Sequence, residues 1–203
     1  GANAGRSASY AYQSNFIGNN AGSNANNAIY SNFIGYGAGI LAGQASYSTF
    51  IGDSAGSYAY SASVSVFIGS SAGASSTNAV SSVFIGQIAG NDAPRASYSN
   101  FIGEAAGQLA LSASYSNFIG YNAGYRAKFA SQSILIGKWA GAGYSGTNGI
   151  GSNNIIIGNN ISFVDNRKDS INIGAIIFAT GSYSGDLVAS VPFKGTSNGR
   201  VGI

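Results

Sequence analysis

Side chains able to carry out acid–base, nucleophilic or metal chemistry are scarce in this chain. Its 203 residues include no histidine, no cysteine and only 6 carboxylates. Without imidazole and thiol groups, the chain lacks the commonest general base, the thiol nucleophile and the nitrogen and sulfur metal ligands. One candidate reaction is hydrolysis of a glycosidic bond, which needs two carboxyl groups about 5–9.5 Å apart.

Asp53 and Glu104 are the carboxylates in equivalent contexts, since each follows the tripeptide Phe-Ile-Gly. They lie three copies apart in a 17-residue repeat, whereas Asp92 occupies a different place in its own copy. If each copy forms one coil of a stack, at about 4.8 Å per coil, Asp53 and Glu104 are roughly 14 Å apart. We therefore expect no catalytic pair within the repeats, no enzymatic activity and no cofactor or metal. A pair formed between neighbouring chains is the alternative that remains open.

Aromatic and basic side chains gather in one stretch, residues 118–145, which includes the only tryptophan. Aromatic faces beside cations can stack on sugars or meet an acidic polysaccharide. The alternative is that they fill an irregular junction created by an insertion at 142–151. The candidate glycan contacts are Tyr121, Tyr125, Arg126, Lys138 and Trp139, with Lys128 and Tyr144 nearby in sequence.

The 17-residue repeat is what positions these side chains. With its aromatic residue as position 1, it reads F-I-G-x-x-A-G-x-x-A-x-x-A-x-x-S-N; an eighth copy carries Leu135 and a ninth Ile156. A short and strict period is typical of solenoids, in which each repeat stacks on the next. The first seven copies begin at Phe16, Phe33, Phe50, Phe67, Phe84, Phe101 and Phe118.

Each copy predicts a short strand followed by a glycine corner. The segment Tyr-Ser-Asn-Phe-Ile, as at 98–102, is rich in strand formers. The alanines at positions 6, 10 and 13 have helical spacing, but the Gly, Ser, Asn and β-branched residues between them are poor helix formers. We therefore predict an all-β fold, a parallel β-solenoid with 17-residue coils, and no helix at 38–45 or 106–113.

The side chains at repeat positions 1 and 2 point to opposite faces of the strand. Stacked coils turn them into a Phe column and an Ile column, and only one of the two can enter the coil. We expect the Ile column to line the inside. The other column then leaves about eight large apolar residues exposed, more than a soluble monomer tolerates. The chain is therefore expected to form a homotrimer around a common axis. The expected interface residues are Phe16, Phe33, Phe50, Phe67, Phe84, Phe101 and Phe118.

The copies of "SNFIGxxAG" and the ending "INIGAIIFATGSYSGDLVASVPFKGTSNGRVGI" resemble the shaft repeats of bacteriophage tail fibres and tail spikes that precede a C-terminal intramolecular chaperone. More distantly, the repeat is similar to the head repeats of trimeric autotransporter adhesins, which use a shorter coil. Both resemblances imply three chains. The first also implies a place in the virion, with other tail or fibre proteins as partners.

Charge density marks a domain boundary. Residues 161–203 carry seven of the 15 charged residues, and the repeat loses its regularity there. We interpret 1–160 as the solenoid shaft and 161–203 as a cap or neck that closes the open end, as solenoids require. Within the irregular region, 153–160 and 170–177 still read as strands of two degenerate coils.

Composition narrows the function further. The net charge of +3 is small and scattered, which argues against nucleic acid, and no apolar run is long enough to insert in a membrane. The expected function is the structural shaft of a tail fibre or spike, presenting host-recognition parts and contacting host surface polysaccharide. The alternative is a bacterial surface adhesin head that binds glycans. Either places the chain on a virion or an extracellular surface. An ice-binding solenoid is disfavoured because Thr49 and Thr77 form no regular ladder.

Overall fold

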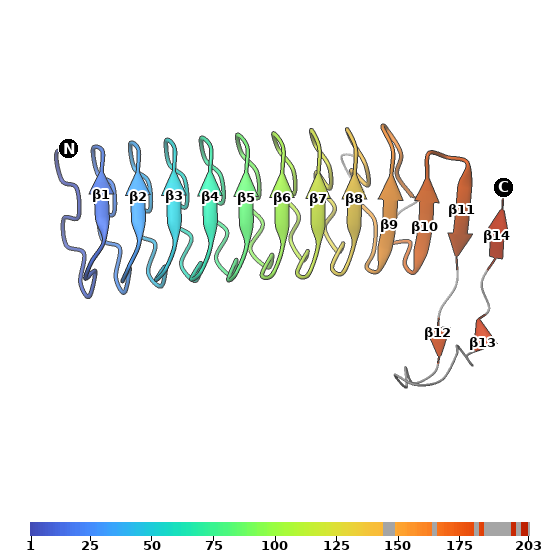
Figure 1. Ribbon diagram of the computed structural model, residues 1–203, viewed down its shortest axis with the longest axis horizontal. Coiled ribbons are helices and arrows are strands. Elements are labelled where there is room, and N and C mark those ends of the chain that lie inside the picture. The colour runs from blue at the N-terminus through green and yellow to red at the C-terminus, as the bar shows by residue number, and fades with distance from the viewer. Residues whose placement is uncertain (144–148, 164–165, 181–182, 185–195, 198–199, 203) are drawn as a thin grey trace.

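The computed structural model confirms the predicted β-solenoid. Over the residues that it describes, all regular structure is β, and ten short parallel strands stack along one axis (Figure 1). The segments 38–45 and 106–113 form turns rather than helices, as expected. The structure describes residues 1–143, 149–163, 166–180, 183–184, 196–197 and 200–202.

Fourteen strands follow one another through the described residues. They are β1 (Asn15–Ile17), β2 (Asn32–Ile34), β3 (Thr49–Ile51), β4 (Val66–Ile68), β5 (Val83–Ile85), β6 (Asn100–Ile102), β7 (Asn117–Ile119), β8 (Ile134–Ile136), β9 (Asn154–Ile157), β10 (Ser170–Ile173), β11 (Ile177–Thr180), β12 (Tyr183–Ser184), β13 (Thr196–Ser197) and β14 (Arg200–Gly202).

Strands β1 to β10 pair in parallel, and up to β8 they pair at equal repeat positions, as Phe33 does with Phe50. The sheet crosses residue 160 without a break, because β9 and β10 also pair in parallel, which confirms the two degenerate coils. Beyond them the direction changes: β11 pairs antiparallel with β10, and β14 antiparallel with β11. Parallel coiling therefore ends at β10.

The interior of each coil holds one large side chain and several small ones. In the coil that begins at β3, Phe50, Ala55, Ala59, Ala62 and Ser65 have no exposed surface. From Phe33 to Phe101 the rings of successive coils stack with centroids 4.7 Å apart and planes inclined by 5°. The spacing of the stack therefore agrees with the predicted coil height.

The expected placement of the two apolar columns is wrong. The position-2 isoleucines lie on the outer face, where Ile51 is 36% and Ile102 38% exposed. The phenylalanines fill their own coil, so they cannot form the interface between chains that was expected of them. Those fully buried are Phe33, Phe50, Phe67, Phe84, Phe101 and Phe118, while Phe16 in the first coil is half-buried.

Glycine at position 7 explains why the phenylalanine lies inside. Gly39 has φ +66°, and a Cβ atom there would lie 2.3 Å from Cδ2 of Phe33. The missing side chain is thus the space that the ring occupies, flat against the backbone of its own coil. Glycine at position 3 acts between coils instead, since a Cβ on Gly69 would lie 2.4 Å from the carbonyl oxygen of Gly86.

A buried serine at position 16 links each coil to the next. The hydroxyl of Ser82 donates to the carbonyl of Ala96 at 2.7 Å and accepts from the amide of Ser99 at 3.2 Å. A hydroxyl that both donates and accepts can satisfy two backbone groups inside the core, where unpaired groups are costly. The same arrangement recurs at Ser31, Ser48, Ser65, Ser99 and Ser116.

The stacking ladder imposes left-handed backbone conformations on residues that disfavour them. Val64 has φ 60° and Ile88 φ 52°, although β-branched side chains rarely adopt positive φ. Their amides donate to the preceding coil, Val64 to the Ser46 carbonyl at 2.9 Å and Ile88 to the Ser70 carbonyl at 2.8 Å. Hydrogen bonds between coils therefore outweigh the local preference.

Replacing a position-7 glycine should be strongly destabilising. In Gly73→Ala, the new Cβ would lie 2.4 Å from Cδ2 of Phe67, at a residue with φ +64°. We expect the free energy of unfolding to fall by at least about 2 kcal/mol, from backbone strain and overpacking. Chemical denaturation checks this. The control is Gly37→Ala at position 5, where Ala105 already has φ 54°; equal losses in both variants would contradict the packing argument.

Relieving strain at position 15 should stabilise the chain. Val64 is 58% exposed, so replacing it by Asn removes little packing, and Asn tolerates positive φ. We expect Val64→Asn to raise the free energy of unfolding by about 1 kcal/mol. Thermal unfolding followed by circular dichroism measures it. Val66→Asn, on strand β4, relieves no such strain, and a gain there as large as at Val64 would refute the explanation.

Candidate functional site

The structure brings the predicted glycan contacts together on two successive coils. Tyr121 and Tyr125 follow β7, and Trp139 follows β8 at repeat position 5, one coil further along the axis. The Trp139 amide donates to the carbonyl of Tyr121 at 2.9 Å. This bond fixes the backbone of the tryptophan beside the coil that bears both tyrosines.

The three aromatic rings contact one another edge to face. The Trp139 ring lies 6.0 Å from the Tyr121 ring and 5.8 Å from the Tyr125 ring, with interplanar angles of 77° and 86°. Edge-to-face pairs at these separations are favourable because ring edges are positive and ring faces negative. Trp139 is thus held between the two tyrosines, and its orientation is set by them.

Two cations cover the outer tyrosine faces. Nζ of Lys138 lies 5.9 Å from the centre of the Tyr121 ring, and Cζ of Arg126 lies 5.2 Å from the centre of the Tyr125 ring. Both distances are within the range of cation–π attraction. The five residues therefore form one aromatic–basic cluster, defined here as Tyr121, Tyr125, Arg126, Lys138 and Trp139.

The aromatic–basic cluster lies on the surface. Tyr121 is 43% exposed and Lys138 is also exposed, while Tyr125, Arg126 and Trp139 are half-buried. Aromatic faces and cationic groups therefore reach solvent together. A sugar ring stacked on such faces, with hydroxyl or carboxylate oxygens near the cations, is the ligand that this chemistry accommodates.

Other residues fill the junction next to the insertion. Ile150 is fully buried and packs with Leu135 in the core, and the amide of Gly143 donates to the Tyr125 carbonyl at 2.7 Å. A Cβ on Gly149 would lie 2.7 Å from the carbonyl oxygen of Arg126, so glycine backbone closes this gap. None of these contacts, all between described residues, involves the Trp139 side chain. Tyr144 lies outside the described residues.

The carboxylates do not converge in the part of the chain that the structure describes. Asp53 follows β3 and Glu104 follows β6, three coil steps of 4.7 Å apart along the axis. The Asp53 carboxylate accepts a hydrogen bond from the neighbouring Ser54 hydroxyl at 2.7 Å. Within the described ranges, no group of three or more acidic, histidine or cysteine side chains could hold a metal ion.

Comparisons with protein-family models, curated proteins and solved structures find no match. The search for membrane-crossing helices, made over the described residues, finds none of sufficient length and apolar character. The function of the chain must therefore be inferred from the surface chemistry of the solenoid.

The sequence did not predict two surface features of the solenoid, the outward isoleucine column and a groove near Arg95. For the isoleucine column, the glycine at position 7 was the signal that could have predicted it.

A truncation at Trp139 distinguishes a surface role from a core role. Because Trp139 makes two aromatic contacts on the surface, Trp139→Ala should cost about 0.5–1.5 kcal/mol for each. A buried core tryptophan would cost about 3–5 kcal/mol instead. Urea denaturation measures the difference, with Leu135→Ala as a core variant of the same coil. A loss at Trp139 as large as the loss at Leu135 would restore the junction interpretation.

Proposed function

We propose that this chain is a rigid shaft segment of a bacteriophage tail fibre or tail spike, assembled as a homotrimer in the virion. The observation that carries the proposal is the uninterrupted register of parallel coils from β1 to β10. Nine steps of about 4.8 Å give a rod of roughly 43 Å from this segment alone. Such a rod holds attached host-recognition parts away from a particle.

Three sets of contacts between successive coils support a mechanical role. Backbone hydrogen bonds, the position-16 serines and the stacked phenylalanine rings all act along the axis. Bending the rod separates coils on one side and breaks all three sets there. A stack of this kind resists bending more than a chain of loosely linked domains does.

The outward isoleucine column supports assembly with further copies of the chain. Strands β1 to β10 carry no charged residue. On their outer face the isoleucines form a long apolar stripe beside a position-17 column of Asn, Thr, Val and Ile, and monomers rarely expose such a stripe. Another copy of the chain has the same coil spacing and can match the stripe along its whole length. The exposed members are Ile17, Ile51, Ile85, Ile102, Ile119, Ile157 and Ile173.

Cyclic closure favours a ring of parallel chains over an open assembly, because it covers the stripe of every copy. Three copies follow from the resemblance to tail fibres and adhesin heads. The second candidate function, a bacterial surface adhesin head, is favoured by the aromatic–basic cluster, whose exposed rings and cations suit glycan contact. The two functions differ in which surface acts, the isoleucine column or the cluster.

Charged substitutions in the isoleucine column should abolish assembly and leave the coil folded. We expect the double variant Ile51→Lys, Ile102→Lys to sediment as a monomer at micromolar concentration, and the unchanged chain as an elongated trimer. The reason is that the interface would otherwise bury six unpaired ammonium groups, at a cost of several kcal/mol each by the ordinary desolvation penalty. Sedimentation equilibrium gives the mass, and sedimentation velocity gives the shape.

The matched control adds the same charges at position 9, in Tyr58→Lys, Leu109→Lys. Arg126 is the native residue at this position, so a cation is tolerated there. Circular dichroism verifies the fold of each variant. A monomeric unchanged chain, or a trimer that survives the isoleucine substitutions, would show that the stripe does not mediate assembly.

A further inference from the structure

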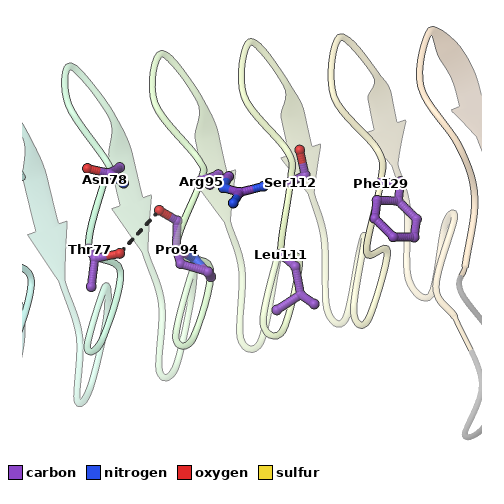
Figure 2. Close-up of a pocket in the computed structure, with 7 residues that line it drawn as sticks. All are labelled: Thr77, Asn78, Pro94, Arg95, Leu111, Ser112 and Phe129. Carbon is purple, nitrogen blue, oxygen red and sulfur yellow. Dashed lines mark hydrogen bonds between the residues drawn. The ribbon is translucent and has the colours of Figure 1, made fainter.

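We propose that a groove across four coils, defined by the residues that line it, binds a carboxylate-bearing sugar of an acidic polysaccharide. The groove has a volume of about 410 Å³, within the usual range of small-ligand sites. It is built from repeat positions 11 and 12, whereas the isoleucine column is at position 2 and the aromatic–basic cluster at positions 4, 5, 8 and 9. Figure 2 shows its residues: Thr77, Asn78, Pro94, Arg95, Leu111, Ser112 and Phe129.

A break in the backbone ladder lies within the groove. At position 12, a parallel ladder joins Gln44, Ser61, Asn78 and Arg95. The Asn78 amide donates to the Pro94 carbonyl at 2.9 Å, and one coil beyond the break the Ser112 amide donates to the Lys128 carbonyl at 2.8 Å.

The equivalent bond on the coil in between is missing, since no backbone hydrogen bond joins the Arg95 amide to the Leu111 carbonyl. A donor and an acceptor are thus left without the ladder partners that their equivalents have. Sugar hydroxyl groups, which both donate and accept, can pair with two such groups at once.

Arg95 supplies the charge of the groove. Its side chain is exposed and extends along the axis toward Ser112 (Figure 2). It is the only charged residue among those that line the groove. No coil carries a carboxylate at position 11 or 12, so neighbouring coils place no acidic residue beside it at these positions. A guanidinium group binds a carboxylate through two parallel hydrogen bonds, which makes this anion its best-matched ligand.

Three apolar side chains, Pro94, Leu111 and Phe129, also line the groove. Leu111 is 41% and Phe129 47% exposed, and Pro94 lies between Thr77 and Leu111 on successive coils. An aromatic face next to an aliphatic one suits the carbon-bound hydrogens of a pyranose ring. The amide of Asn78 and the hydroxyl of Ser112 add hydrogen-bonding groups for sugar hydroxyls.

The dimensions and charges of this region favour a polymer over a single small anion. The groove spans three coil steps of 4.7 Å, about 14 Å, along a straight axis. Between residues 92 and 143 the basic side chains are Arg95, Arg126, Lys128 and Lys138, against the two acids Asp92 and Glu104. This excess of positive charge attracts a polyanion and raises its rate of association.

Calorimetric titration of the folded chain with a galacturonic acid tetramer tests the proposal. The neutral control ligand is the same tetramer with its carboxylates methyl-esterified. We expect binding of the acid and at least about tenfold weaker binding of the ester, since a hydrogen-bonded charge is lost. The same loss is expected in Arg95→Gln with the acid, and a several-fold loss in Phe129→Ala.

Arg6→Gln is the matched control variant, because it removes one exposed positive charge ahead of β1, outside both the groove and the aromatic–basic cluster. It should bind the acid tetramer as the unchanged chain does. An equal loss in Arg6→Gln, equal binding of acid and ester, or no binding of the acid would each overturn the proposal. So would tighter binding of tetraglutamate than of the uronate, which would indicate an acidic protein partner. Sedimentation of the same samples measures their oligomeric state. Failure of sugar binding can therefore be distinguished from failure of the proposed trimer to assemble.

Discussion

Room for one aromatic ring inside each of the first seven coils is the constraint on which the rest of the structure depends. The ring of Phe67 lies against Gly73, whose missing side chain provides the space, and it stacks on Phe50 and Phe84 at 4.7 Å. The other fully buried side chains of the coils that hold a phenylalanine are alanine and serine. Interiors packed this closely tolerate neither extra nor missing volume. The stack therefore fixes the height, width and register of these coils together.

Because the register is fixed, residues at the outer positions must adopt whatever backbone conformation the hydrogen bonds between coils require. Val64 and Ile88 accept left-handed backbone because each amide must meet the carbonyl of the preceding coil. The same ladder allows the outward side chains to vary freely from coil to coil, as at position 4, which holds Asp53, Ser70 and Lys138 in different copies. A solenoid of this type thus separates a uniform interior that gives stiffness from an exterior that can carry recognition.

The outer surface has three regions of different chemistry. The isoleucine column is long, apolar and uncharged, which suits another copy of the same rod. The aromatic–basic cluster gathers rings and cations around Trp139. The groove at Arg95 lies where the position-12 ladder is interrupted, so it combines backbone polar groups with a charge.

The sequence alone determined the period, the strand positions, the coil spacing and the absence of helix in the repeats. It did so because a strict repeat forces every copy into the same conformation, and Gly, Ser and Asn between the alanines exclude a helix. It also placed the residues of the aromatic–basic cluster near one another, since consecutive coils are neighbours in space.

Only the tertiary structure decided which apolar column faces inward. Phe and Ile alternate on the strand and are both strongly apolar, so alternation and hydrophobicity give no preference between them. The choice comes from a glycine six residues further on, as Gly39 shows for Phe33, which leaves space on the inner side alone. The groove at Arg95 was equally hidden, because it results from one missing hydrogen bond between coils and from no distinctive residue pattern.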